Sequence, residues 1–186
     1  MADGYHHGDL RSVVLRHAAD QIAQDGVDGL SLRGLAQRSG VSHAAPAHHF
    51  GDRRGLFTAL ATEGFDLLAA ELVAAGPELK EVAVAYVRFA LARPGHFAVM
   101  FRSDLLRADD PDLAAARRRS GQALREGVGR LDGVADPAAV QLAAWSVVHG
   151  FASLWREGAF AGSDLLDTSA DPEEAARRVV ERLSFS

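Results

Sequence analysis

The sequence contains no cysteine among its 186 residues, and this absence removes several functions at once. Without a thiol the chain has no disulfide, no thiolate nucleophile and no cysteine ligand for zinc. With 48% hydrophobic residues, a chain of this length buries a core in one or two domains and needs no such cross-link. The absence also fits the reducing conditions of the cytoplasm.

Long apolar runs are missing as well. No run approaches the roughly 20 residues that a helix needs to span a bilayer, and the N-terminal stretch MADGYHHGDL is polar. We therefore expect neither a membrane helix nor a signal peptide, and we predict a cytoplasmic protein that has no membrane partner.

The chain also lacks an excess of positive charge. It has 20 basic and 25 acidic residues, a formal net charge of -5. Proteins that coat nucleic acid without regard to sequence are normally basic, so this balance disfavours an architectural DNA protein. Any binding to DNA must therefore be local and depend on the geometry of a particular site.

Apolar residues at helical spacing run through the whole sequence, and no alternating strand pattern bounded by hairpin turns occurs. The sequence therefore predicts an all-α fold. The first helix is expected over about residues 8–24, and a longer one begins at the capping residue Asp52 and ends before Gly76. Further helices are predicted at 77–92, 110–131, 137–160 and 171–184, with a short apolar piece at 96–101.

Between these helices, residues 31–57 (SLRGLAQRSGVSHAAPAHHFGDRRGLF) hold two short helical patterns that meet at a tight turn. Ser31 is expected to cap the first helix and Ser42 the second. Gly40 supplies the left-handed backbone that ends the first helix, and Val41 packs into the angle between the two. This is the layout of a helix-turn-helix, whose second helix lies in the DNA major groove.

The outward residues of that second helix are small or hydrogen-bonding, as a surface that reads base edges requires. They are Ser42, His43, Ala44, Ala45, His48 and His49. His48 and His49 point about 100° apart on a helix, and His43 lies five residues earlier, so the three do not share one face. No metal site is predicted.

The chain resembles the TetR family of transcriptional regulators. The resemblance is carried by Val14-Leu15, Ala18-Ala19, Gly26, the run from Ser31 to Ser42 and the run from His48 to Phe57. The C-terminal half resembles the subgroup named for a Trp-His-Gly pattern, here Trp145, His149 and Gly150. The resemblance implies a DNA-binding domain over residues 1–52 and a helical ligand-binding and dimerisation domain over residues 53–186.

Site residues carry over from the family by position. Ser31 and Arg33 match phosphate contacts, and His49 and Arg53 match positions that meet the DNA backbone. Ser42, His43, Ala44, Ala45 and His48 match the reading helix. Two positions depart from the family pattern. Ala47 replaces a tyrosine and its DNA contact, and Pro46 removes an amide early in the helix if Ser42 is the cap.

The family also implies a small-molecule pocket in the second domain. The residues predicted to line it are Phe97, Met100, Phe101, Trp145 and His149. An apolar lining with few polar groups indicates a moderately sized, largely apolar effector. The alternative is that these aromatic residues are ordinary core and that His149 is a core histidine with its hydrogen bonds satisfied.

The helix at 137–160 is apolar on two sides. Val140, Ala144, Val147, Phe151 and Leu154 lie on one side, and Leu142, Trp145 and Val148 on another. A helix that is apolar on two faces is buried on both, which indicates a partner subunit. The last helix, 171–184, is amphipathic, with Ala176, Val179, Val180 and Leu183 inward. Two such helices per chain predict a four-helix homodimer interface.

Together these features predict a bacterial, ligand-responsive repressor that binds a pseudo-palindromic double-stranded DNA operator as a homodimer and is released by its effector. No nucleophile and base pair, metal-ligand spacing or phosphate loop occurs, so neither an enzyme nor a cofactor is predicted. The alternative hypothesis is a helical ligand carrier or enzyme that does not bind DNA.

Overall fold

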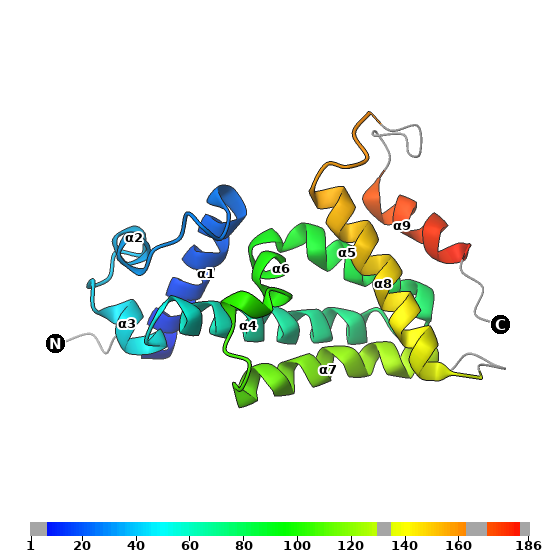
Figure 1. The fold of residues 1–186 in the computed structure, drawn as a ribbon, viewed down its shortest axis with the longest axis horizontal. Coiled ribbons are helices and arrows are strands. Elements are labelled where there is room, and N and C mark those ends of the chain that lie inside the picture. The colour runs from blue at the N-terminus through cyan, green and yellow to red at the C-terminus, as the bar shows by residue number, and fades with distance from the viewer. Residues whose placement is uncertain (1–6, 130–134, 163–170, 183–186) are drawn as a thin grey trace. The chain divides into compact units, whose positions relative to one another are not determined.

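The computed structural model describes residues 7–129, 135–162 and 171–182. Within these ranges every regular element is a helix, which confirms the all-α prediction (Figure 1). The helices are α1 (His7–Asp25), α2 (Leu32–Arg38), α3 (Ala45–Phe50), α4 (Arg53–Ala74), α5 (Leu79–Ala92), α6 (Pro94–Met100), α7 (Pro111–Val128), α8 (Pro137–Arg156) and α9 (Pro172–Glu181), with a 3₁₀ turn at Ser103–Leu105. None of the described helices is long and apolar enough to cross a membrane.

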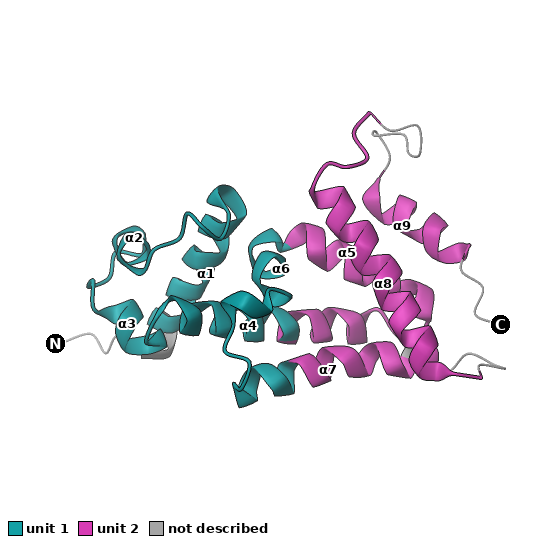
Figure 2. Cartoon of the chain, in the orientation of Figure 1, with its two compact units in different colours: residues 1–65, 93–116 teal, residues 66–92, 117–186 magenta. Residues whose placement is uncertain are grey.

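The helices form two compact units (Figure 2). Unit 1 consists of Met1–Phe65 and Arg93–Ala116, and unit 2 of Asp66–Ala92 and Arg117–Ser186. The long helices α4 and α7 therefore each contribute their first part to unit 1 and their second part to unit 2. The predicted domains, 1–52 and 53–186, are consecutive segments of the sequence. The compact units instead alternate along it, and the predicted boundary stays a prediction.

Unit 1 is built on the apolar stripe of α1. Val14, Ala18 and Ile22 are buried as the helical spacing predicts, and Leu10 is half-buried. The start of α6 approaches α1 so closely that only glycine fits there. A Cβ atom at Gly95 would lie 2.0 Å from the Ala19 carbonyl oxygen. The close packing of α6 on α1 therefore depends on this one residue.

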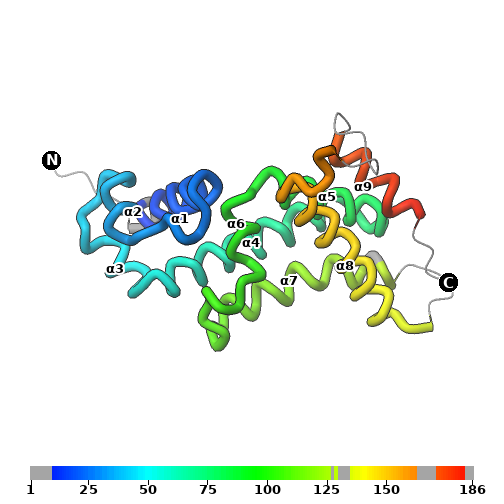
Figure 3. Tube along the Cα trace, turned by 45° about the horizontal axis from the view of Figure 1, so that its top comes forward, coloured from blue at the N-terminus to red at the C-terminus, as the bar shows by residue number. Residues whose placement is uncertain are grey.

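In unit 2, α8 and α9 pack on α5 (Figure 3). Helix α5 is buried at almost every position from Val82 to Ala90, and Arg88 is the exposed exception. Of the apolar residues predicted to face inward on α9, Ala176 and Val180 are buried and Val179 is half-buried. Leu183, and the end of the predicted helix at 184, lie outside the described residues.

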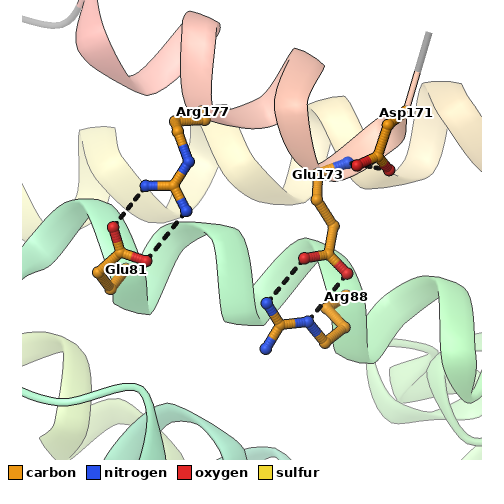
Figure 4. Close-up of polar contacts among 5 residues, drawn as sticks. All are labelled: Glu81, Arg88, Asp171, Glu173 and Arg177. Carbon is orange, nitrogen blue, oxygen red and sulfur yellow. Dashed lines mark hydrogen bonds and ion pairs between the residues drawn. The ribbon is translucent and has the colours of Figure 1, made fainter.

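Two bidentate ion pairs also join α9 to α5 (Figure 4). The Arg88 guanidinium donates to both carboxylate oxygens of Glu173, at 2.9 and 2.7 Å. Arg177 donates in the same way to Glu81, with one of its two bonds at 3.1 Å. Asp171 caps the start of α9 by accepting the Glu173 amide at 3.2 Å. Polar contacts therefore hold successive turns of α9 against the same helix.

Helix α8 divides its apolar residues between the interior of unit 2 and solvent. Ala144, Val148 and Phe151 are buried. Leu142 and Leu154 are 60% and 45% exposed. The prediction that this helix is apolar on two sides is confirmed, but two residues change sides. Val148 faces inward and Leu154 outward, the reverse of the predicted grouping.

Candidate nucleic-acid interface

The first helix of the predicted motif, α2, begins as its sequence indicates. The Ser31 hydroxyl oxygen accepts the Gly34 amide at 3.1 Å, and its backbone is extended as in an N-cap. Gly40 has a φ of 65°, the left-handed conformation expected after the helix. The predicted cap and the predicted turn glycine are both confirmed.

The second helix of the motif, α3, begins later than predicted. Ser42 is not its cap, because α3 starts at Ala45 and no side chain caps it. The reason is Pro46, which has no amide hydrogen and is tolerated only in the first turn of a helix, where amides have no intrahelical acceptor. The Ser42 carbonyl instead accepts the Ala45 amide at 3.0 Å and closes a turn before the helix.

The predicted base-reading residues form an accessible surface on this turn and helix. Ser42, His43, Ala44 and His48 are exposed, and Ala45 and His49 are half-buried. The inward side of α3 is formed by Pro46 and Phe50, which are buried. The histidine rings at 48 and 49 meet edge to face with centroids 5.4 Å apart. The exposed residues carry no acidic group, which suits an approach to base edges and phosphates.

The two arginines predicted to contact the DNA backbone differ in their surroundings. Arg33, on α2, is exposed. Arg53 is half-buried, donates a hydrogen bond to the Val27 carbonyl and lies 5.0 Å from the centroid of the Phe57 ring. Arg53 thus joins the start of α4 to the loop after α1, and this hydrogen bond uses part of the donor capacity of its guanidinium.

The start of α4 is fixed by a carboxylate. Asp52 Oδ1 accepts the Gly55 amide at 2.7 Å and the Arg107 guanidinium at 2.9 Å, which confirms Asp52 as the predicted cap. The Gly55 amide, and then Arg107, hold the pKa of the Asp52 carboxyl below its usual value. Arg107 was not among the predicted functional residues, because no local pattern links it to a partner so far away in sequence.

Three of the predicted effector-pocket residues lie in unit 1, on or just after α6. Phe97 and Met100 are buried and Phe101 is half-buried. The Phe101 ring meets those of Phe97 and Phe65 edge to face, each at a centroid distance of 5.4 Å. These aromatic contacts are those of an ordinary packed core.

The other two predicted pocket residues, Trp145 and His149, lie in unit 2 beside Tyr86 of α5. The Tyr86 hydroxyl is 2.8 Å from His149 Nδ1 and 3.4 Å from Trp145 Nε1. Burial raises the pKa of the Tyr86 phenol and lowers the pKa of His149. Tyr86 was missed in the sequence, although a tyrosine inside the apolar run VAVAYV is a recognisable signal that a buried hydroxyl needs a partner.

Tyr86 also lines a small cavity of about 20 Å³ in unit 2. Its lining is apolar except for Tyr86 and consists of Leu72, Leu79, Val82, Ala83, Tyr86, Leu124, Ala144 and Val148. Among the described residues, no three side chains of the kinds that bind metals come together.

The fold and this site define an all-helical protein with a helix-turn-helix near its N-terminus. Residues 14–60 match the profile of the bacterial regulatory proteins of the tetR family. Residues 79–183, more than half of the chain, match the tetracyclin repressor-like C-terminal domain. The chain belongs to the TetR family of bacterial regulatory proteins.

Two curated relatives match the N-terminal region. The transcriptional repressor AcnR of Corynebacterium glutamicum is 42% identical over 53 residues, which is 28% of each chain. The class A tetracycline repressor of transposon 1721 from Escherichia coli is 46% identical over 50 residues, 27% of this chain and 23% of that protein. The chain thus matches only about a quarter of the length of these relatives.

Solved structures match over nearly the whole chain. A protein of unknown function from Rhodococcus sp. RHA1 is 35% identical, with a TM-score of 0.78 over 97% of this chain and 96% of that one. The TetR family regulator PfmR of Thermus thermophilus has a TM-score of 0.68 over 90% of this chain and 94% of that one, at 24% identity. The second likeness concerns the fold alone.

Proposed function

We propose that this chain is a transcriptional repressor of the bacterial cytoplasm, without enzymatic activity, that binds a pseudo-palindromic operator as a homodimer. The observation that carries the proposal is the capped helix-turn-helix, whose second helix exposes small and hydrogen-bonding residues. The curated relatives matched over this region are named as repressors, which supports the same function for this chain.

The DNA contacts follow from the positions of the exposed residues. Ser42, His43, Ala44, Ala45 and His48 would face the base edges, and Ser31, Arg33, His49 and Arg53 the phosphates. Two copies related by a twofold axis would place their α3 helices in successive major grooves, about 34 to 36 Å apart. Arg33 is exposed near the start of the motif. Ala47 lacks the hydroxyl with which the family's tyrosine contacts DNA.

We assign the dimer interface to α8 and α9, with α8 supplying the apolar contact. Leu142 and Leu154 are exposed on α8, whereas the buried residues of α9 are already packed within unit 2. The outward side of α8 also carries Ala143, Ser146 and Gly150, and a Cβ atom added at Gly150 meets nothing within 4 Å. Small residues allow a second helix to approach closely.

A small, largely apolar effector would release the operator by favouring a conformation in which the two α3 helices are wrongly spaced. A coupling free energy of about 1 to 3 kcal/mol between effector binding and operator binding is sufficient, since it changes operator affinity roughly 5- to 150-fold.

The test is a selection of bound fragments from the source genome, followed by titration of the selected DNA at several salt concentrations. Nanomolar binding whose affinity falls steeply with salt concentration supports the proposal. Equal affinity for all fragments would instead indicate an architectural protein. Ligand binding or turnover without any DNA binding would favour the helical carrier or enzyme.

A further inference from the structure

Among the residues that line the apolar cavity of unit 2, Tyr86 is the one whose side chain carries a polar group. Tyr86 is only 5% exposed, and its neighbours along α5 are valine and alanine. A buried hydroxyl in such surroundings is costly unless it is hydrogen-bonded, and His149 and Trp145 supply its two partners.

The direction of these two hydrogen bonds follows from the chemistry of the partners. An indole N–H can only donate, so the Tyr86 oxygen accepts from Trp145. The buried phenol keeps its proton and the half-buried His149 stays neutral, since burial disfavours the charged form of each. Of these two partners only His149 Nδ1 can accept the Tyr86 hydrogen, which assigns the ring proton of the neutral imidazole to Nε2. The Tyr86 oxygen then accepts on the side where Trp145 lies.

Trp145 is the partner that can be replaced. Its bond to Tyr86 is 3.4 Å long, compared with 2.8 Å for the bond between Tyr86 and His149. The Trp145 side chain is also 38% exposed, whereas Tyr86 is buried, so Trp145 is the partner that borders solvent. Its rotation outward would give up the contact with the His149 ring at a centroid distance of 5.7 Å. A ligand that donates a hydrogen bond would satisfy the Tyr86 oxygen equally well.

The space available sets the size of such a ligand. A cavity of about 20 Å³ holds little more than one water molecule. Outward rotation of Trp145 would vacate the volume of an indole beside Tyr86, which is enough for a single ring. No charged side chain lines the cavity, and an ion moved there from water would have no counter-charge.

We propose that unit 2 binds uncharged, ring-sized molecules with one hydrogen-bond donor, such as cyclic alcohols and phenols, and that the donor replaces the Trp145 N–H at the Tyr86 oxygen. The inference rests on the proposed function in one respect, namely that this chain has a small-molecule effector. It adds the chemical class of the effector and assigns Tyr86 as the residue that selects it.

The experiment uses the full chain with Trp155→Phe, which leaves Trp145 as the only tryptophan of the two in the sequence. Three probes of one size are titrated: cyclohexanol, methoxycyclohexane, which accepts but does not donate, and cyclohexanecarboxylate, which is charged. Binding is followed by Trp145 fluorescence and by the midpoint of thermal unfolding. We expect cyclohexanol to bind about 2- to 12-fold more tightly than the ether, the range of one net hydrogen bond.

Two variants test the role of the hydroxyl. Tyr86→Phe retains the ring and should bind the alcohol and the ether equally. Trp145→Phe removes the competing donor and should bind cyclohexanol more tightly than the parent, as measured by the thermal midpoint. An unchanged preference in Tyr86→Phe, equal binding of the carboxylate, or no binding of cyclohexanol to any variant would overturn the proposal.

Operator binding without ligand is measured on the same protein. If the operator is bound and cyclohexanol is not, the effector class is wrong and the repressor function stands. If cyclohexanol binds as expected and no DNA is bound, the repressor function fails while the ligand site stands.

Discussion

Ser31 has two roles at the level of a single residue, because it caps α2 and stands at a position predicted to touch phosphate. Its hydroxyl oxygen already accepts the Gly34 amide, and its hydrogen remains to be donated to a DNA oxygen. Loss of the side chain would therefore weaken both the fold and the complex with DNA, and the two effects have to be separated.

Ser31→Ala should lower the free energy of unfolding by about 0.5 to 2 kcal/mol, the usual value of an N-cap. Ser31→Asp should keep the cap and so restore stability, but its charge should repel phosphate and weaken operator binding. Chemical denaturation and DNA titration measure the two effects. Ser42→Ala is the matched control, because Ser42 caps nothing in the structure. A loss of stability in Ser42→Ala as large as that in Ser31→Ala would contradict this assignment.

Asp52 gives a pH dependence whose sign follows from its hydrogen bonds. The pKa of its carboxyl is lowered in the folded protein, first by the Gly55 amide and then by Arg107. The stabilisation is therefore present above the unfolded pKa of about 3.9 and is lost as the pH falls through the folded value. Asp52→Asn, which keeps a capping oxygen without the charge, should be less stable than the parent at neutral pH. The difference should shrink in acid, as measured by urea unfolding at each pH.

At the level of whole elements, local patterns predicted the helices well. Apolar spacing and Gly or Pro stops determine where a helix runs, and these are properties of neighbouring residues. The predicted first helix, 8–24, lies within one residue of α1 at either end. The start of helix α3 was predicted less well, because two local signals compete there. Ser42 favours a helix that begins directly after it, but Pro46 is tolerated only in the first turn, and the proline decides where the helix begins.

Contacts between distant residues could not be predicted in the same way. Tyr86 meets His149, and Asp52 meets Arg107, across long stretches of chain. Their pairing depends on how the helices pack, which no local spacing records. The same reason explains why the five predicted pocket residues fall into two groups, one in each compact unit.

The ion pairs between α5 and α9 should contribute little stability each, since their side chains are about a third to a half exposed. In a double-mutant cycle, Glu81→Gln and Arg177→Gln should show only a small coupling free energy, decreasing in high salt. The bidentate pair of Arg102 and Asp104, only two residues apart, is the control and should leave global unfolding unchanged. A coupling free energy for the first pair as large as that of a buried ion pair would show that we underestimate the strength of an exposed pair.

At the scale of the whole molecule, the proposed homodimer depends on α8. Leu142→Arg should place a charge in the apolar contact, shift the protein from dimer to monomer and weaken operator binding, because one chain offers only one α3 helix. Sedimentation at several concentrations measures the association. Val73→Arg is the control, since Val73 is 68% exposed on α4 and lies outside the proposed interface. If Leu142→Arg stays dimeric, the interface does not include the outward side of α8.

The interleaving of the compact units has a consequence for experiments that exchange DNA-binding domains between relatives to change which operator is bound. A chimaera joined after residue 52 would take α1 from one parent and α6 from the other. The backbone of α1 at Ala19 would then face a foreign residue at position 95, where even a methyl group does not fit. A functional exchange has to carry residues 1–65 together with 93–116, so the transplantable module is discontinuous in the gene.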